Sequence, residues 1–127
     1  MDQVDLTLSE WRQTKFVYGQ TDCMLSIGKY IAERGGIDVT GKFIGKYHTQ
    51  AGGLSHMARN GGVKGLVEMT GWHPILMPIR GCVVAVRYGE YDEIGALCTG
   101  DGVAMRLERG VMEIPYRLAR IVGMWRG

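Results

Sequence analysis

The sequence has no apolar run approaching the ~20 residues that a membrane-spanning helix needs, so no membrane span is expected. Its charge is nearly balanced, with 15 Lys and Arg, 13 Asp and Glu, and a net charge of +2. This balance gives no electrostatic reason to expect nucleic acid or an anionic membrane surface as a partner. No apolar stretch follows the first methionine, so a signal peptide is not expected.

Cysteine is scarce, with three residues at the scattered positions 23, 82 and 98. An odd, scattered set argues against a disulfide framework and fits a protein made in a reducing cytosol. The cysteines and histidines show neither Cys-x-x-Cys nor His-Glu-x-x-His spacing. The turn Gly100-Asp101-Gly102 lacks the further acidic ligands of a calcium loop and the Lys-Ser/Thr of a phosphate loop. No metal ion and no cofactor are therefore expected.

Glycine, in contrast, is abundant: 20 of 127 residues, or about 16%, against an average near ~7%. The glycines follow no fixed period, which indicates many tight turns between short elements. A chain of this length has the size of one domain and can bury a hydrophobic core without disulfides or a structural metal. Residues 1–127 are predicted to form a single domain.

The first half of the chain is predicted to be helical and the second half to form strands. Helices followed by consecutive strands with short connections indicate an α+β fold, in which N-terminal helices pack on an antiparallel meander over residues 81–125. The first helix is predicted to start at Thr7 as N-cap, and the second at Cys23 with Asp22 or Thr21 as N-cap. Two further helices are expected over residues 54–60 and 63–69, and strands over 82–88, 94–99, 103–107, 111–114 and 121–125.

Cys23 is the first candidate for chemistry, because it falls in the first turn of the second predicted helix. Free backbone N–H groups and the helix dipole stabilise a thiolate at this position, so the pKa of the thiol is expected to fall. Papain-like enzymes activate their nucleophile in this way. The alternative is a small buried cysteine that packs under a helix start without chemistry.

The run Phe16-Val17-Tyr18-Gly19-Gln20-Thr21-Asp22-Cys23 resembles the nucleophile segment of the NlpC-like cysteine peptidases, which cut peptidoglycan stem peptides. A closer resemblance is to small phage and prophage proteins related to those peptidases. It covers nearly the whole chain through short segments: Gly45-Lys46-Tyr47, Ala51-Gly52, Gly61-Gly62, Arg80-Gly81-Cys82-Val83-Val84, Ile94-Gly95-Ala96 and Trp125-Arg126. The resemblance implies a papain-like fold for residues 1–127.

The chain departs from the peptidase pattern at the position of the catalytic base. The catalytic histidine of the family begins the second strand in a His-Val-Gly-Ile pattern, and Glu93 stands at that position here. Cys82 replaces the aspartate of the first strand. A glutamate does not act as the imidazole base at neutral pH unless its pKa rises far above ~4.3. Asp22 does not replace the base, because a neighbouring carboxylate raises the thiol pKa.

A histidine elsewhere in the chain is the remaining candidate for the base that would pair with the Cys23 nucleophile. His48, His56 and His73 all precede the predicted sheet. Of these, His48 lies on a predicted loop that is able to fold over Cys23. A solvated or hydrogen-bonded surface histidine is the plainer interpretation of each. The candidate catalytic residues, active or vestigial, are therefore Cys23, His48 and Glu93.

Two functions follow from the resemblance. The first is a phage virion protein of the tail or tail tip, made in the host cytoplasm, that keeps a peptidase-like fold without activity and assembles with other tail proteins. The second is an active cysteine hydrolase that cleaves peptidoglycan during DNA entry. Cys23 would then be the nucleophile, with His48 or a partner chain's histidine as base and the Cys23 N–H in the oxyanion hole. The position of Glu93 favours the first.

Overall fold

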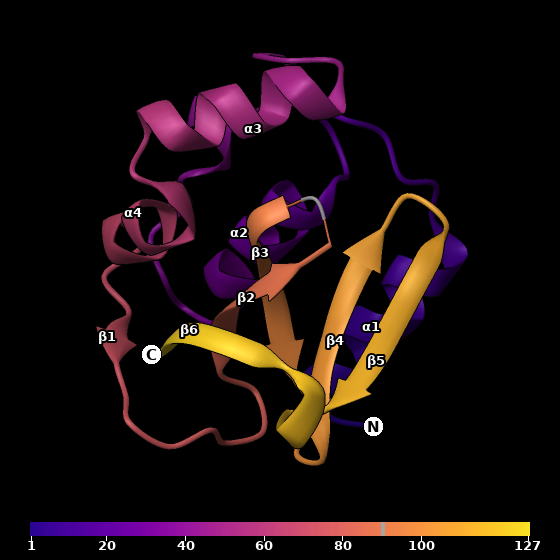
Figure 1. Cartoon of the computed structure of the whole chain (residues 1–127), viewed down its shortest axis with the longest axis vertical. Helices are drawn as coiled ribbons and strands as arrows, with labels where there is room; N and C mark the ends of the chain where they lie inside the picture. The colour runs from indigo at the N-terminus through magenta and orange to yellow at the C-terminus, as the bar shows by residue number, and fades with distance from the viewer. Residues whose placement is uncertain (90) are drawn as a thin grey trace.

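The computed structural model describes the backbone of residues 1–89 and 91–127, and the side chains of all of these except 91 and 92. Helices come first and strands follow, so the fold is α+β, as the sequence predicted (Figure 1). The helices are α1 (Gln3–Gln13), α2 (Cys23–Glu33), η1 (Thr40–Lys42), α3 (Gln50–Arg59), α4 (Gly62–Met69) and η2 (Tyr116–Leu118). The strands are β1 (His73–Pro74), β2 (Val83–Tyr88), β3 (Tyr91–Cys98), β4 (Gly102–Leu107), β5 (Gly110–Pro115) and β6 (Arg120–Arg126).

The strands form one six-stranded antiparallel sheet in the order β1-β6-β2-β3-β4-β5. Strands β2 to β5 are the predicted meander. The last strand departs from it, because η2 carries the chain back and β6 pairs with β2 instead of extending the sheet beyond β5. Strand β2 is therefore an interior strand, because β3 and β6 satisfy the backbone groups along its two edges.

The helix starts differ from prediction where a cap lies further upstream. Asp2 is the N-cap of α1 and its side chain accepts a hydrogen bond from the Asp5 N–H, whereas the predicted cap Thr7 is buried within the helix. Helix α3 begins four residues before its predicted start, where Thr49 accepts a hydrogen bond from the Gly52 N–H. The predicted N-cap Asp22 of α2 is confirmed.

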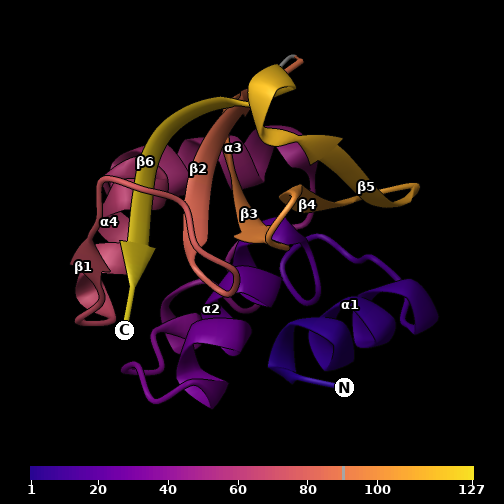
Figure 2. The ribbon, with the colours of Figure 1, turned by 90° about the horizontal axis from the view of Figure 1, so that it is seen from below.

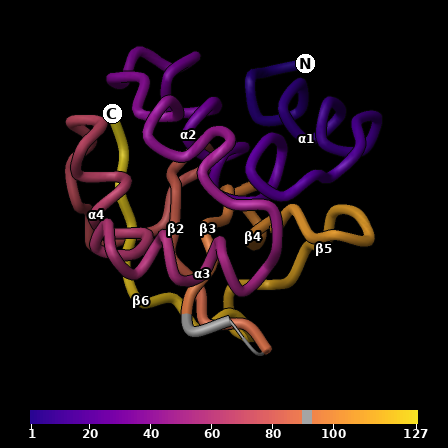
Figure 3. Tube along the Cα trace, turned by 90° about the horizontal axis from the view of Figure 1, so that it is seen from above, coloured from indigo at the N-terminus to yellow at the C-terminus, as the bar shows by residue number. Residues whose placement is uncertain are grey.

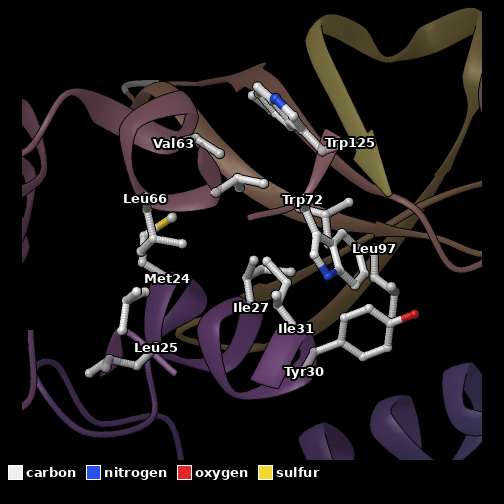
Figure 4. Packing of buried hydrophobic residues seen from close by; sticks show 14 of the residues in the cluster. Met24, Leu25, Ile27, Tyr30, Ile31, Val63, Leu66, Trp72, Leu97 and Trp125 are labelled. Atoms are coloured by element: carbon white, nitrogen blue, oxygen red, sulfur yellow. The ribbon is translucent and has the colours of Figure 1, made fainter. Parts of the chain in front are cut away.

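The first core lies between the helices and one face of the sheet. Helix α2 lies between α1 and α4 in two opposite views (Figures 2 and 3). Its residues Ile27, Tyr30 and Ile31 are each at most 1% exposed. They pack with residues of α4 and β3 and with two tryptophans (Figure 4). Burial of each such side chain contributes about 1.5–3 kcal/mol of transfer free energy, which fixes α2 on the sheet.

A second core lies on the opposite face of the sheet. The sheet curves strongly, and β6 and η2 arch over that face (Figure 2). Val84 and Val86 of β2 point into this second core, whereas Val83 and Ala85 belong to the first. Both faces of β2 are therefore buried, which explains its continuous apolar sequence. Within the part of the chain that the structure describes, no helix has the length and apolar character to cross a membrane.

Candidate functional site

Cys23 is the first residue of α2, and the buried carboxylate of Asp22 holds this end of the helix. Oδ1 accepts hydrogen bonds from the backbone N–H groups of Met24 at 3.1 Å and Leu25 at 3.0 Å. Oδ2 accepts from the Gly19 N–H at 2.8 Å and from the Tyr47 hydroxyl at 2.6 Å. One carboxylate thus joins the helix start, the loop before it and the segment around Tyr47.

Gly19 explains the glycine of the sequence motif. Its φ is +79°, a left-handed conformation that side chains disfavour, and a Cβ here would collide with the Tyr47 carbonyl oxygen. The Gly19 carbonyl oxygen also accepts a hydrogen bond of 2.9 Å from the Gly45 N–H. The two segments therefore approach each other through their backbones, and only glycine fits the contact.

Arg106 of β4 anchors the loop that precedes the motif. The residue is 4% exposed, and its guanidinium donates to Ser26 Oγ at 3.1 Å, to Thr14 Oγ1 at 2.7 Å and to the carbonyl oxygens of Thr14 and Lys15. Burial lowers the pKa of this arginine. The role of Arg106 was not predicted, because a single arginine in an apolar strand gives no signal of burial.

Cys23 and Glu93 line the same narrow pocket, between α2, α3, the start of α4 and β3. Its cavity volume is about 50 Å³, which is room for about one or two water molecules. An extended peptide does not enter a space of this size without rearrangement of the walls. The full lining is Tyr18, Asp22, Cys23, Met24, Tyr47, Gln50, Gly53, Leu54, Met57, Gly62, Val63 and Glu93.

The pKa of the Cys23 thiol is raised to about 12. Cys23 is half-buried, and the loss of water around the thiolate is the larger cause of the rise, to which the charge of Asp22 adds. The backbone N–H groups of Cys23 and Met24 act in the opposite direction but are outweighed. The predicted fall in the pKa at this helix start is therefore wrong. Cys23 carries its proton at neutral pH.

Glu93 is engaged in a structural contact. Its Oε1 accepts a hydrogen bond of 2.7 Å from the backbone N–H of Val63, at the start of α4. The carboxylate therefore caps a helix from a neighbouring strand and faces the positive end of its dipole. Gly62 allows this approach, because its φ is +71° and a Cβ there would lie 2.5 Å from Glu93 Oε1.

None of the three histidines is among the described residues that line this pocket. His48 is exposed in the turn before α3, and His73 is exposed in β1. His56 Nε2 lies 2.9 Å from the Lys42 carbonyl oxygen, and its ring packs on those of Phe43 and Tyr47. Of the three candidate catalytic residues, the structure brings Cys23 and Glu93 together and places His48 outside the pocket lining so far as the chain is described.

No group of three or more His, Cys, Asp or Glu side chains is arranged to hold a metal ion among the residues described. A family model with the description "Domain of unknown function (DUF6950)" matches residues 2–126. No curated protein and no solved structure matches the chain.

Proposed function

The chain belongs to the DUF6950 family, and we propose that it is an NlpC-like, papain-like fold without hydrolase activity that serves as a structural protein of a phage tail or tail tip. The observation that carries the proposal is the hydrogen bond from the Val63 N–H to Glu93. By the resemblance, Glu93 stands at the position of the catalytic base of the NlpC-like peptidases, and in this chain it caps a helix.

The placement of Cys23 and Glu93 supports the peptidase-like part of the proposal. A cysteine at the start of a helix and a residue early in the neighbouring strand line one pocket, as a nucleophile and its base must. Helix α2 packs on β3, so the helix start and the strand are held in fixed relation. The resemblance to the NlpC-like segment assigns the same two roles to these positions.

The chemistry of the pocket argues against hydrolysis. A nucleophilic cysteine reacts as the thiolate, and the pKa of about 12 keeps Cys23 protonated at neutral pH. No histidine belongs to the described lining of the pocket. The motif residues Gly19 and Asp22 have structural tasks at the helix start, and these tasks do not depend on a catalytic base.

Association with other tail proteins is supported by apolar side chains on the surface. Leu76 and Met77, between β1 and β2, are 94% and 72% exposed, and Leu118 of η2 is 65% exposed. Covering such exposed apolar groups with a partner removes them from water, which favours association. The proposed localisation is the virion, after synthesis in the host cytoplasm.

Hydrolase activity is tested by the turbidity of purified bacterial cell walls, with wild-type protein, the Cys23→Ala variant and buffer. We expect equal clearing rates in all three samples. Faster clearing by the wild type than by Cys23→Ala would contradict the proposal and establish the alternative function, an active peptidoglycan hydrolase with Cys23 as nucleophile. Circular dichroism of both proteins checks that the variant is folded.

The structural role is tested in particles of the phage whose genome encodes the chain. We expect mass spectrometry of purified particles to detect the protein. Deletion of its gene is expected to stop infectious particles from forming, and both wild type and Cys23→Ala supplied in trans are expected to restore them. Particles that lack the protein, or rescue by the wild type alone, would contradict the role.

A further inference from the structure

The two remaining cysteines face each other inside the second core. Cys82 directly precedes β2 and Cys98 is the last residue of β3, and they are 1% and 0% exposed. Their sulfur atoms lie 2.9 Å apart, with one thiol hydrogen-bonded to the other. This pair is separate from Cys23, whose thiol lies in the pocket with Glu93.

The pairing of β2 with β3 puts the two residues opposite each other. Val83 is the register partner of Leu97, and the Cys98 N–H donates to the Cys82 carbonyl oxygen at 2.9 Å. Directly opposed residues in antiparallel strands have Cα atoms about 4.5–5.5 Å apart, within the range of about 4.4–6.8 Å that disulfides span. The backbone therefore already has the spacing that a disulfide needs.

We propose that Cys82 and Cys98 form a redox-active dithiol, which a hydroperoxide oxidises to a reversible disulfide between β2 and β3. A disulfide bond is about 2.05 Å long, so the sulfurs approach by less than about 1 Å when it forms. The odd, scattered cysteine count of the sequence hides this pair, since only the register of the sheet brings positions 82 and 98 together.

The chemistry needs two steps and one peroxide. The Cys82 thiolate attacks a peroxide oxygen, the O–O bond breaks, and the leaving hydroxide takes up a proton as water, or as an alcohol if the oxidant is organic. The sulfur of Cys98 then attacks the Cys82 sulfenic acid. The S–S bond forms, the S–O bond breaks, and the departing oxygen leaves as water with the proton of Cys98. Two thiols are oxidised and one peroxide is reduced.

The surroundings of the pair favour Cys82 as the attacking sulfur. The hydrogen bond between the two sulfurs lowers the pKa of Cys82 and raises the pKa of Cys98. The Tyr116 hydroxyl lies beside Cys98. Burial is the larger cause that raises the pKa of Tyr116, and the interaction with Cys98 adds to it, so the phenol stays protonated. Both cysteines are buried at strand ends, close to Gly81 and Gly100, so the proposed oxidation requires these ends to open locally before a small oxidant reaches the sulfurs.

The proposal is tested on the wild-type protein with hydrogen peroxide as the probe. After treatment, the protein is denatured and alkylated with N-ethylmaleimide, and its intact mass is measured. We expect one alkylated cysteine in place of three, with three restored by dithiothreitol. Trypsin without reduction is expected to release residues 81–87 joined to residues 88–106. Three alkylated cysteines after peroxide, or a disulfide that includes Cys23 or links two chains, would overturn the proposal.

Two variants complete the test. Cys23→Ser is the matched control, because its thiol is outside the pair, and we expect the same joined peptides from it. Peroxide is expected to raise the thermal unfolding temperature of the wild type, because the disulfide constrains the unfolded chain. Cys98→Ala is expected to lose both this rise and the joined peptides. If Cys98→Ala does not fold, the wild-type peptide map decides alone, and joined peptides absent from that map would refute the disulfide.

Discussion

Glu93 of β3 and Val63 of α4 are joined by a hydrogen bond of 2.7 Å between Oε1 and the backbone N–H. The bond supplies a carboxylate cap to a helix whose own cap residue, Gly61, offers no side chain. It also occupies the side chain that the proposed resemblance to NlpC-like enzymes puts at the position of a catalytic histidine. The contact thus gives Glu93 a structural role, and it supports the proposed absence of hydrolysis.

The cap makes Glu93 a stabilising residue. Glu93→Ala leaves the Val63 N–H without this acceptor, so we expect the free energy of unfolding to fall by about 1–2 kcal/mol. Glu93→Gln keeps a carbonyl acceptor, so its free energy of unfolding is expected to fall by less than that of Glu93→Ala. Urea denaturation measures both. The matched control is Glu68→Ala, which removes only an exposed pair with Lys64 on the same helix and is expected to change stability by less than about 0.5 kcal/mol. Equal losses for Glu93→Ala and Glu68→Ala would contradict the cap.

The Tyr47 hydroxyl ties the helix start of Cys23 to the segment before α3. Tyr47→Phe removes a buried hydrogen bond to the charged Asp22, and we expect a loss of about 1.5–3 kcal/mol in the free energy of unfolding. Tyr88→Phe is the control, because its hydroxyl donates to Met112 Sδ, a weak acceptor near the surface. A loss no larger than that of the control would show that the bond to Asp22 contributes nothing.

Gly19 is required for two reasons that can be separated by experiment. Gly19→Ala meets both a positive φ and the Tyr47 carbonyl oxygen, so we expect a loss of more than about 2 kcal/mol on thermal or urea unfolding. Gly45→Ala has a positive φ of 72° with open space around it, and its expected loss is about 1 kcal/mol. If the two variants are equally stable, the close contact between Gly19 and the Tyr47 carbonyl oxygen does not add to the loss of stability.

The shared pocket of residues 23 and 93 is tested by placing an imidazole in it. In Glu93→His we expect the pKa of the Cys23 thiol to fall by at least about one unit, because an imidazolium nearby stabilises the thiolate. Glu93→Gln is expected to leave that pKa near its wild-type value. Rates of Cys23 alkylation against pH, resolved by peptide mapping, measure it. An unchanged pKa in a folded Glu93→His protein would argue against a peptidase-like placement of these positions.

The sequence was informative where a local rule decides the structure. The Asp22 cap, the order of helices and strands, and the turns at glycines all follow from neighbours along the chain. The start of α1 was missed because Thr7 and Asp2 both offer a cap, and burial of Thr7 decided between them. The return of β6 to β2 was missed because strand order depends on contacts that no local pattern records.

The candidate site was predictable in its residues and much less so in its energetics. The motif located Cys23 at a helix start, and Glu93 was singled out because the resemblance puts a histidine at that position. The pKa of Cys23 was predicted in the wrong direction, since the helix dipole is a local feature and burial is a tertiary one. The contact between Glu93 and Val63 likewise depends on how α4 packs on β3.

The proposed inertness of Cys23 is tested by the pH dependence of its alkylation by iodoacetamide in the native wild-type protein. A thiol in an unfolded chain ionises near ~8.5, whereas burial raises the pKa of folded Cys23 to about 12. Folding therefore becomes less favourable as the pH rises above ~8.5, and controls must confirm the native state at each pH. We expect a slow rate at neutral pH that is still rising at the highest pH at which the protein stays folded. A rate that reaches its plateau with a midpoint well below ~8.5 would show an activated thiolate and contradict the proposed loss of hydrolase chemistry.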